Sequence, residues 1–200
     1  MASSSWWSSE DLWRKVAIWV TAVMFVVLII LTFNSMSHIL AGSDRVPPYS
    51  VINKRIFYQF NDTRTRMIPV IGDKEPLFGK ILSDEEAEKI VTKGKLTIQS
   101  KNCINCHTLL GNGAYYAPDL TKAWLDPTWA SEDIREQLMV NFLMDPSTNA
   151  RTYGSGRKMP NLGITKEEAK SIVAFLKWMS AINTNGFPNN FQAIKQGGKS

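Results

Sequence analysis

The sequence predicts a mainly α-helical protein in which one N-terminal transmembrane helix precedes a small helical domain. Residues 16–33 contain no charged side chain, and capping boxes that begin at Ser83 and Thr165 are each followed by apolar residues at helical spacing. These patterns divide the chain into four parts. They are an N-terminal segment with the anchor at 1–40, an extended linker at 41–80, a helical domain at 81–185 and a polar tail at 186–200.

The composition leaves room for one modest domain besides the anchor. The 200 residues include 23 Lys and Arg against 18 Asp and Glu, which gives a formal net charge of +5. This basic excess is mild and its residues are scattered, so we expect no nucleic-acid binding. The largest local group, Lys89, Lys93 and Lys95, is more typical of the solvated face of a helix than of a docking patch.

The uncharged run is long enough to cross a lipid bilayer, because its helix would span about 27 Å. Trp13 and Trp19 lie where an interfacial aromatic belt is expected, and Arg14 and Lys15 favour a cytoplasmic N-terminus. Residues after 40 would then lie outside the cytoplasm.

A cleaved signal peptide is the alternative interpretation of the apolar run. Its processing site would be Ile39-Leu40-Ala41 or Ser35-Met36-Ser37. The apolar core, however, is longer than the roughly 7–15 residues usual in signal peptides, and neither site fits the small-x-small rule well. Both interpretations deliver the rest of the chain to the outer side of the membrane.

The linker at 41–80 begins with Pro47-Pro48, which interrupt a helix and favour extended chain. Apolar residues alternate imperfectly over residues 51–60, Asn61-Asp62 is a turn candidate, and residues 63–71 could form a return strand. We expect a short hairpin that contacts the anchor or a partner, or that covers the domain with ordinary packing residues.

The first helix of the domain is expected to begin at the capping box Ser83-Asp84-Glu85-Glu86 and to end near Gln99. Gly94 lies at its centre and weakens it by about 1 kcal/mol relative to Ala. A close contact at this glycine would explain its presence.

Two further helices are expected in the second half of the chain. One would be capped by Ser131, carry Glu132 and Asp133 in its first turn, and end at Asp145-Pro146. The other would begin at the capping box Thr165-Lys166-Glu167-Glu168 and present an apolar stripe. We expect this last helix to pack across the first.

Both cysteines of the chain and one of its two histidines lie in Cys103-Ile104-Asn105-Cys106-His107. This spacing is typical of the attachment of c-type haem. Each thiol can add to one vinyl group of the porphyrin, and the imidazole of His107 then lies beneath the ring, where it can bind the iron. We therefore predict one covalently bound haem c in a domain of the class I cytochrome c type.

Other sites built on two thiols fit less well. A zinc site usually has four ligands, and the only other histidine, His38, lies beside the apolar run. A thioredoxin-like dithiol would need a βαβ context, which the flanking sequence lacks. A structural disulfide across two intervening residues is rarer still. Covalent haem also agrees with the predicted anchor, because haem is attached in bacteria on the outer side of the inner membrane.

The stretch after His107 contains Gly111-Asn112-Gly113, whose glycines prevent a helix and let backbone approach the haem edge or another chain. A phosphate-binding loop is not favoured, because no strand precedes the stretch and no Lys-Ser/Thr pair follows it. An open loop is therefore expected here.

Methionine is the natural second axial ligand, because His38 lies on the membrane side. Met159 is the best candidate. It follows Gly154-Ser155-Gly156-Arg157-Lys158 and precedes Pro160, so a loop can bring its thioether against a flat ring. An iron held in this way has no open position for a substrate and carries one electron at a time.

Two other methionines are weaker candidates for this ligand. Met139 lies on the apolar stripe of a predicted helix, which favours ordinary core packing, and Met144 lies at the end of that helix. Both remain alternatives to Met159.

Three stretches of the chain closely resemble the small cytochrome c subunit of bacterial nitric oxide reductase. They are the haem motif with the loop that follows it, residues 103–120, then Arg157-Lys158-Met159-Pro160, and finally Phe175-Leu176-Lys177-Trp178. The resemblance covers the anchor and about residues 80–190. Residues 45–80 depart from it, because they are longer than the usual connection in that family.

The resemblance implies a non-catalytic electron-transfer subunit in the bacterial inner membrane, with its haem domain on the periplasmic face. It would accept electrons from a soluble cytochrome c or cupredoxin. It would pass them to a catalytic membrane subunit with haem b and non-haem iron, which reduces two NO to N2O and water. The resemblance also implies an interface calcium ion bound by backbone oxygens of Gly113 and Tyr115.

Two other functions share part of this pattern. A free anchored electron shuttle, or the cytochrome subunit of a haem-copper oxygen reductase, would have the motif and the anchor but would not need the loop after His107. A haem peroxidase would need an open position on the iron.

Overall fold

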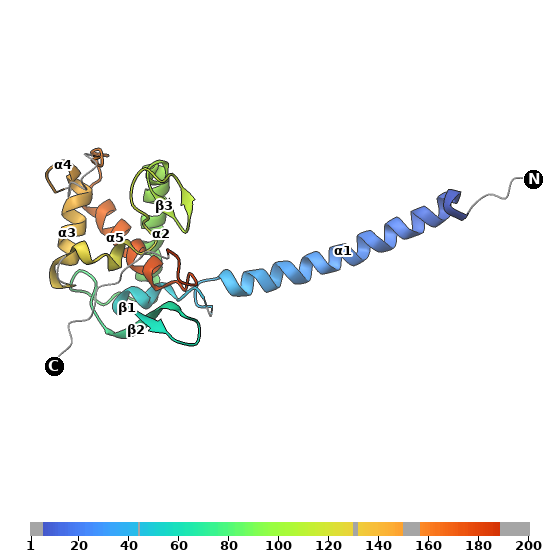
Figure 1. Ribbon diagram of the computed structural model, residues 1–200, viewed down its shortest axis with the longest axis horizontal. Helices are drawn as coiled ribbons and strands as arrows, with labels where there is room; N and C mark the ends of the chain where they lie inside the picture. The colour runs from blue at the N-terminus through green and yellow to red at the C-terminus, as the bar shows by residue number, and fades with distance from the viewer. Residues whose placement is uncertain (1–5, 44, 130–131, 150–156, 189–200) are drawn as a thin grey trace, which may run out of the picture.

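The computed structural model describes residues 6–43, 45–129, 132–149 and 157–188, and the account below concerns these residues. A long N-terminal helix extends away from a mainly helical domain that carries one longer β-hairpin (Figure 1). The predicted helix cap Ser131, the stretch Gly154-Ser155-Gly156 and residues 189–200 of the predicted tail lie outside the described residues.

The N-terminal helix α1 covers Glu10–Ile39, and none of its residues is buried. The hydroxyl of Ser9 caps it by accepting a hydrogen bond from the Leu12 amide at 3.4 Å. By length and composition α1 can cross a membrane, two criteria that an N-terminal signal sequence also meets. Because its apolar side chains are exposed along the whole helix, they need an apolar environment that the domain does not provide.

The strands β1, Lys54–Asn61, and β2, Arg66–Lys74, pair antiparallel as a hairpin. The side chain of Asn61 accepts a hydrogen bond from the Arg64 amide at 2.9 Å and stabilises the turn. Thr65 has a left-handed φ of 48° and still belongs to the turn. The return strand therefore begins three residues later than the sequence pattern predicts.

The hairpin region packs on the domain. The Tyr58 hydroxyl donates to the Ser180 carbonyl at 3.2 Å, and the Trp178 indole donates to the Pro47 carbonyl at 3.1 Å. The core that the helices form also contains four buried side chains from this region, Val51, Ile52, Ile56 and Leu77. The core thus draws on residues from both sides of the boundary predicted at residue 81.

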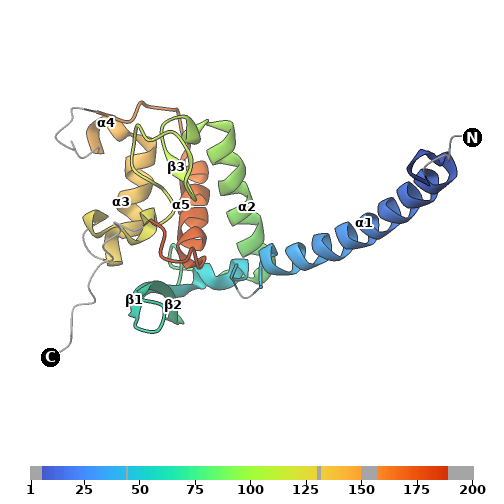
Figure 2. The ribbon, with the colours of Figure 1, turned by 45° about the vertical axis from the view of Figure 1, so that its right-hand side comes forward.

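The helices α2, Asp84–Ser100, and α5, Lys166–Ala181, lie side by side in the middle of the domain (Figure 2). Both begin at the predicted capping boxes, in which the hydroxyl of Ser83 or Thr165 and a glutamate three residues later exchange hydrogen bonds with the backbone. The two boxes and the packing of the last helix on the first are therefore confirmed. α2 ends one residue beyond the predicted Gln99.

The helix α3, Glu132–Met144, packs against α5, and the short helix α4, Pro146–Asn149, follows it. α3 ends at the predicted Asp145-Pro146. Its buried face includes an arginine, Arg135, which is 3 % exposed. The guanidinium of Arg135 lies 5.0 Å from the ring centre of Trp124, and this contact provides a favourable environment for the charge inside the domain.

α2 and α5 approach each other closely at Gly94. A Cβ atom at this position would overlap the carbonyl group of Ser171 and lie 2.8 Å from the Cβ of Phe175. The close contact expected at this glycine is therefore present. The helix accepts a residue of low helix propensity because any larger one would push the two helices apart.

The variant Gly94→Ala should lower the free energy of unfolding by about 2 kcal/mol, because the new methyl group overlaps backbone atoms of α5. This loss should appear although Ala is the better helix former by about 1 kcal/mol. Denaturant titration followed by circular dichroism measures it. Thr92→Ala, on the exposed face of the same helix, is the matched control and should be nearly neutral. A Gly94→Ala protein as stable as the control would contradict the close crossing.

Candidate haem-binding site

The cysteine motif follows α2 directly. Asn102 has a left-handed φ of 53°, and Cys103–Asn105 forms one turn of 3-10 helix. The amides of Cys106 and His107 donate to the Cys103 carbonyl at 3.2 and 2.9 Å. No disulfide joins the two thiols, and burial raises the pKa of the Cys103 thiol.

A cavity of about 370 Å³ brings the predicted haem-binding residues together, since its lining includes Cys103, Cys106, His107 and Met159. Much of the remaining lining is apolar and includes Leu120, Ala123, Trp129, Phe142 and Leu162. A flat apolar ring needs such walls, and two thiols, an imidazole and a thioether are the groups that attach and ligate haem in cytochromes c. The residues therefore fit this cofactor.

The other residues considered as axial ligands lie elsewhere. Met139 is 2 % exposed and belongs to the core, Met144 is 38 % exposed at the end of α3, and neither lines the cavity. His38 lies in the last turn of α1. Met159 is the methionine that the fold places with the cysteine motif on this cavity.

The imidazole of His107 is held by its Nδ1 atom, which lies 2.7 Å from the carbonyl oxygen of Pro118. A carbonyl oxygen can only accept a hydrogen bond, so Nδ1 carries the proton and donates it. The Nε2 atom then has a free lone pair, as a metal ligand requires. Sequence reasoning missed Pro118, because nothing in the chain except its place in the loop connects it with His107.

The loop that carries Pro118 is closed by hydrogen bonds to the motif. The Ala117 amide donates to the Cys106 carbonyl and the Leu120 amide to the Thr108 carbonyl, both at 2.8 Å. The Thr108 hydroxyl donates to the carboxylate of Asp119 at 2.6 Å. These contacts on both sides of Pro118 fix its carbonyl and therefore the plane of the imidazole.

The backbone at Gly113 takes a conformation and a close contact that require glycine. The strands β3, Thr108–Leu109, and β4, Asn112–Gly113, form a small antiparallel pair. Gly113 has a φ of 122°, and a Cβ atom there would overlap the His107 carbonyl and lie 3.0 Å from the Ile104 carbonyl oxygen. Because Gly113 has no side chain, the loop can pack directly against the backbone of the cysteine motif.

A buried lysine, Lys122, supports the far side of the loop. It is 1 % exposed, and its ammonium donates to the Ile182 carbonyl at 2.9 Å and to the Ser180 carbonyl at 3.4 Å. The ammonium also lies 4.7 Å from the ring centre of Tyr58. Burial lowers the pKa of Lys122 from 10.5 to about 7, and the negative charge of Asp119 opposes part of this shift. No sequence pattern indicated that this lysine is buried.

Comparison with known proteins agrees with this site. Residues 91–180 match the family model of cytochrome c, and such a domain implies haem c. The chain is 31 % identical over 118 residues to the C subunit of nitric oxide reductase from Stutzerimonas stutzeri, across 58 % of this chain and 76 % of that protein. It is 34 % identical over 111 residues to the protein of the same name from Paracoccus denitrificans, across 56 % of this chain and 73 % of that protein. The protein of that name from Halomonas halodenitrificans is 30 % identical over 118 residues, across 56 % of this chain and 73 % of that protein. The predicted fold class, an N-terminal apolar helix followed by a cytochrome c domain, is confirmed.

The free energy of unfolding should rise between pH 7 and about 9.5 through Lys122. In this window the unfolded chain binds a proton at Lys122 that the folded protein has released, so higher pH favours the folded state, by on the order of 3 kcal/mol. Denaturant titrations across this range measure the effect. In Lys122→Met the rise should shrink by this amount.

The exposed Lys89 provides the matched control for this measurement. Lys89→Met should keep the pH dependence of the natural protein. Equal slopes in Lys122→Met and in the natural protein would mean that Lys122 stays charged in the fold.

Proposed function

Because this chain belongs to the family of the nitric oxide reductase C subunits, we propose that it is a membrane-anchored cytochrome c with a single haem. It accepts electrons from a soluble cytochrome c or cupredoxin and passes them to a catalytic membrane subunit. That subunit, with haem b and non-haem iron, reduces two NO to N2O and water. The observation that carries the proposal is the cavity on which both thiols, His107 with its free Nε2 atom, and Met159 meet.

Each of the four residues has a defined role in this proposal. Cys103 and Cys106 attach the cofactor through thioether bonds, and His107 and Met159 provide its axial ligands. A haem with this ligand pair transfers single electrons, and the weakly donating thioether raises its reduction potential. With His107 and Met159 both bound to the iron, no position on it would remain for peroxide or NO. The proposal therefore favours an electron carrier over a peroxidase.

The anchor in this proposal is α1, with its N-terminus in the cytoplasm and the haem domain on the periplasmic side of the bacterial inner membrane. The exposed apolar surface of α1 and the place of the domain at one end of it support the arrangement (Figure 1). Arg14 and Lys15 at the start of the apolar run support the orientation.

An interface calcium ion is part of the proposal. Its ligands on this chain would be the backbone oxygens of Gly113 and Tyr115. Tyr115 is 79 % exposed, so the loop is accessible to a second protein. Calcium accepts backbone carbonyls among its oxygen ligands, and the remaining ones would come from the partner and from water.

A free anchored shuttle, or the cytochrome subunit of an oxygen reductase, is the alternative function. Purification of the full chain from native membranes in a mild detergent separates the two. We expect a large membrane protein to co-purify and the preparation to consume NO with a reduced soluble donor. A preparation that contains the chain without a partner, or that consumes oxygen but no NO, would contradict the proposal.

Replacement of the second axial ligand, Met159→Ala, should leave haem attached but lower the reduction potential by on the order of 0.1 V. The vacated position should also let the reduced protein bind CO. Intact mass and the pyridine haemochrome spectrum establish that the haem remains, and a redox titration gives the potential. Met144→Ala is the control and should behave as the natural protein. An unchanged spectrum in Met159→Ala would assign the ligand to another residue.

A further inference from the structure

We propose that Lys101 and Arg157 hold the two ends of the segment that carries Met159, and that they thereby position its sulfur as an axial ligand. This segment, residues 157–163, is called the strap below. Both side chains also line the cavity, and the role that we assign to them is that of positioning residues, which act on the cofactor through Met159. The inference rests on the assignment of Met159 in the proposed function.

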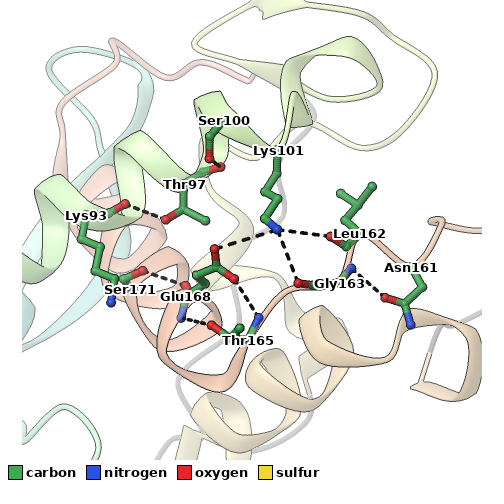
Figure 3. Close-up of polar contacts among 10 residues, drawn as sticks. All are labelled: Lys93, Thr97, Ser100, Lys101, Asn161, Leu162, Gly163, Thr165, Glu168 and Ser171. Atoms are coloured by element: carbon green, nitrogen blue, oxygen red, sulfur yellow. Dashed lines mark hydrogen bonds and ion pairs between the residues drawn. The ribbon is translucent and has the colours of Figure 1, made fainter.

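Lys101 holds the C-terminal end of the strap. It follows α2 directly and precedes the cysteine motif. Its ammonium donates to the carbonyls of Leu162 and Gly163 at 3.3 and 3.4 Å, which are long hydrogen bonds strengthened by the charge. It also lies 3.9 Å from a carboxylate oxygen of Glu168 (Figure 3). One ammonium thus connects the start of the motif with the strap and with α5.

The groups that face Lys101 are themselves fixed. The Glu168 carboxylate accepts a hydrogen bond from the Thr165 amide at 2.8 Å in the capping box of α5. The Asn161 side chain accepts a hydrogen bond from the Gly163 amide at 2.9 Å, and Gly163 takes a φ of 61° (Figure 3). Lys101 therefore binds a preformed turn and not a loose chain. Its side chain is 26 % exposed, so solvent screens this contact only in part.

Arg157 holds the other end of the strap. Its guanidinium donates to the Tyr116 carbonyl at 2.9 Å and lies 4.6 Å from the centre of the Tyr116 ring. Tyr116 lies two residues before Pro118, whose carbonyl holds the His107 imidazole. The strap is therefore attached at one end to the loop that orients His107, and at the other end to the turn that carries the thiols.

These two attachments have a consequence for the iron–sulfur contact. A thioether is a neutral, weak ligand, so an added anion can displace it from ferric iron. The apparent affinity for such an anion depends on the fraction of molecules in which Met159 has moved away. Removal of either attachment should raise this fraction, because the strap then has more conformations in which the sulfur is out of reach.

The test compares Lys101→Met and Arg157→Met with the natural full chain that carries its haem. Cyanide binding to the ferric protein and the weak red absorption band of the methionine–ferric haem bond are measured. We expect the cyanide affinity to rise about fivefold in each variant, as the loss of a hydrogen bond that solvent partly screens implies, and the band to weaken. Lys101→Arg, which keeps the charge and the donors, should restore most of both signals.

Two controls separate positioning from general stability. Ser83→Ala breaks the capping box at the far end of α2, so it destabilises the domain without touching the strap. Lys95→Met removes an exposed lysine from the same helix. Neither control should change the cyanide affinity or the band.

Three outcomes would overturn the inference in different ways. A Lys101→Met or Arg157→Met protein with the cyanide affinity of the natural chain would exclude that residue as a positioning residue. An equal rise in Ser83→Ala would show that the effect follows from stability alone. A natural chain without the methionine band would overturn the assignment of Met159 itself, which distinguishes failure of the proposed ligand from failure of the strap.

Discussion

The crossing of α2 and α5 at Gly94 is the constraint on which the site depends. The cysteine motif continues α2 beyond its C-terminus, and the Met159 segment leads into the N-terminus of α5. Because the helices touch at a residue without a side chain, these two ends lie close enough for Lys101 to reach Glu168 at 3.9 Å. The separation of His107 and Met159, the two proposed iron ligands, is therefore set by how the helices pack, although neither residue belongs to a helix.

The surroundings of His107 show how the loop after the motif contributes to electron transfer. The carbonyl of Pro118 selects the protonated Nδ1 atom, and the hydrogen bonds on either side of Pro118 hold that carbonyl in place. Gly113 lets the loop fold back on the motif. In the proposed function, an imidazole held in this way would limit the rearrangement that accompanies electron transfer. Tyr115 in the same loop is exposed, and in the proposed function this part of the loop contacts the partner subunit.

The hairpin, the buried lysines and the segment after α1 hold the N-terminal part of the chain against the helical domain. Lys177, which is fully buried, pairs with Glu75 at 2.7 Å just after β2, and Lys122 binds the carbonyls at the end of α5. The backbone of Arg45 and Pro47, shortly after α1, accepts hydrogen bonds from Asn183 and Trp178. The chain that leaves α1 is thus attached to the C-terminal end of α5. In the proposed arrangement this short attachment keeps the haem domain near the membrane surface.

The sequence by itself determined the features that depend on residues close together in the chain. The uncharged run of α1, both capping boxes and the spacing of two thiols and an imidazole are local patterns, and each has a direct physical meaning at that range. The placement of Met159 beside the cysteine motif could also be anticipated, because a loop methionine can reach a shared cavity more easily than one packed in a helix; its role as an iron ligand stays a prediction. Only the tertiary structure decided that Pro118 orients His107, that the hairpin belongs to the core, and that Lys122 and Lys177 are buried. Each of these depends on contacts between segments far apart in the sequence, and such contacts leave no mark in the spacing of neighbouring residues.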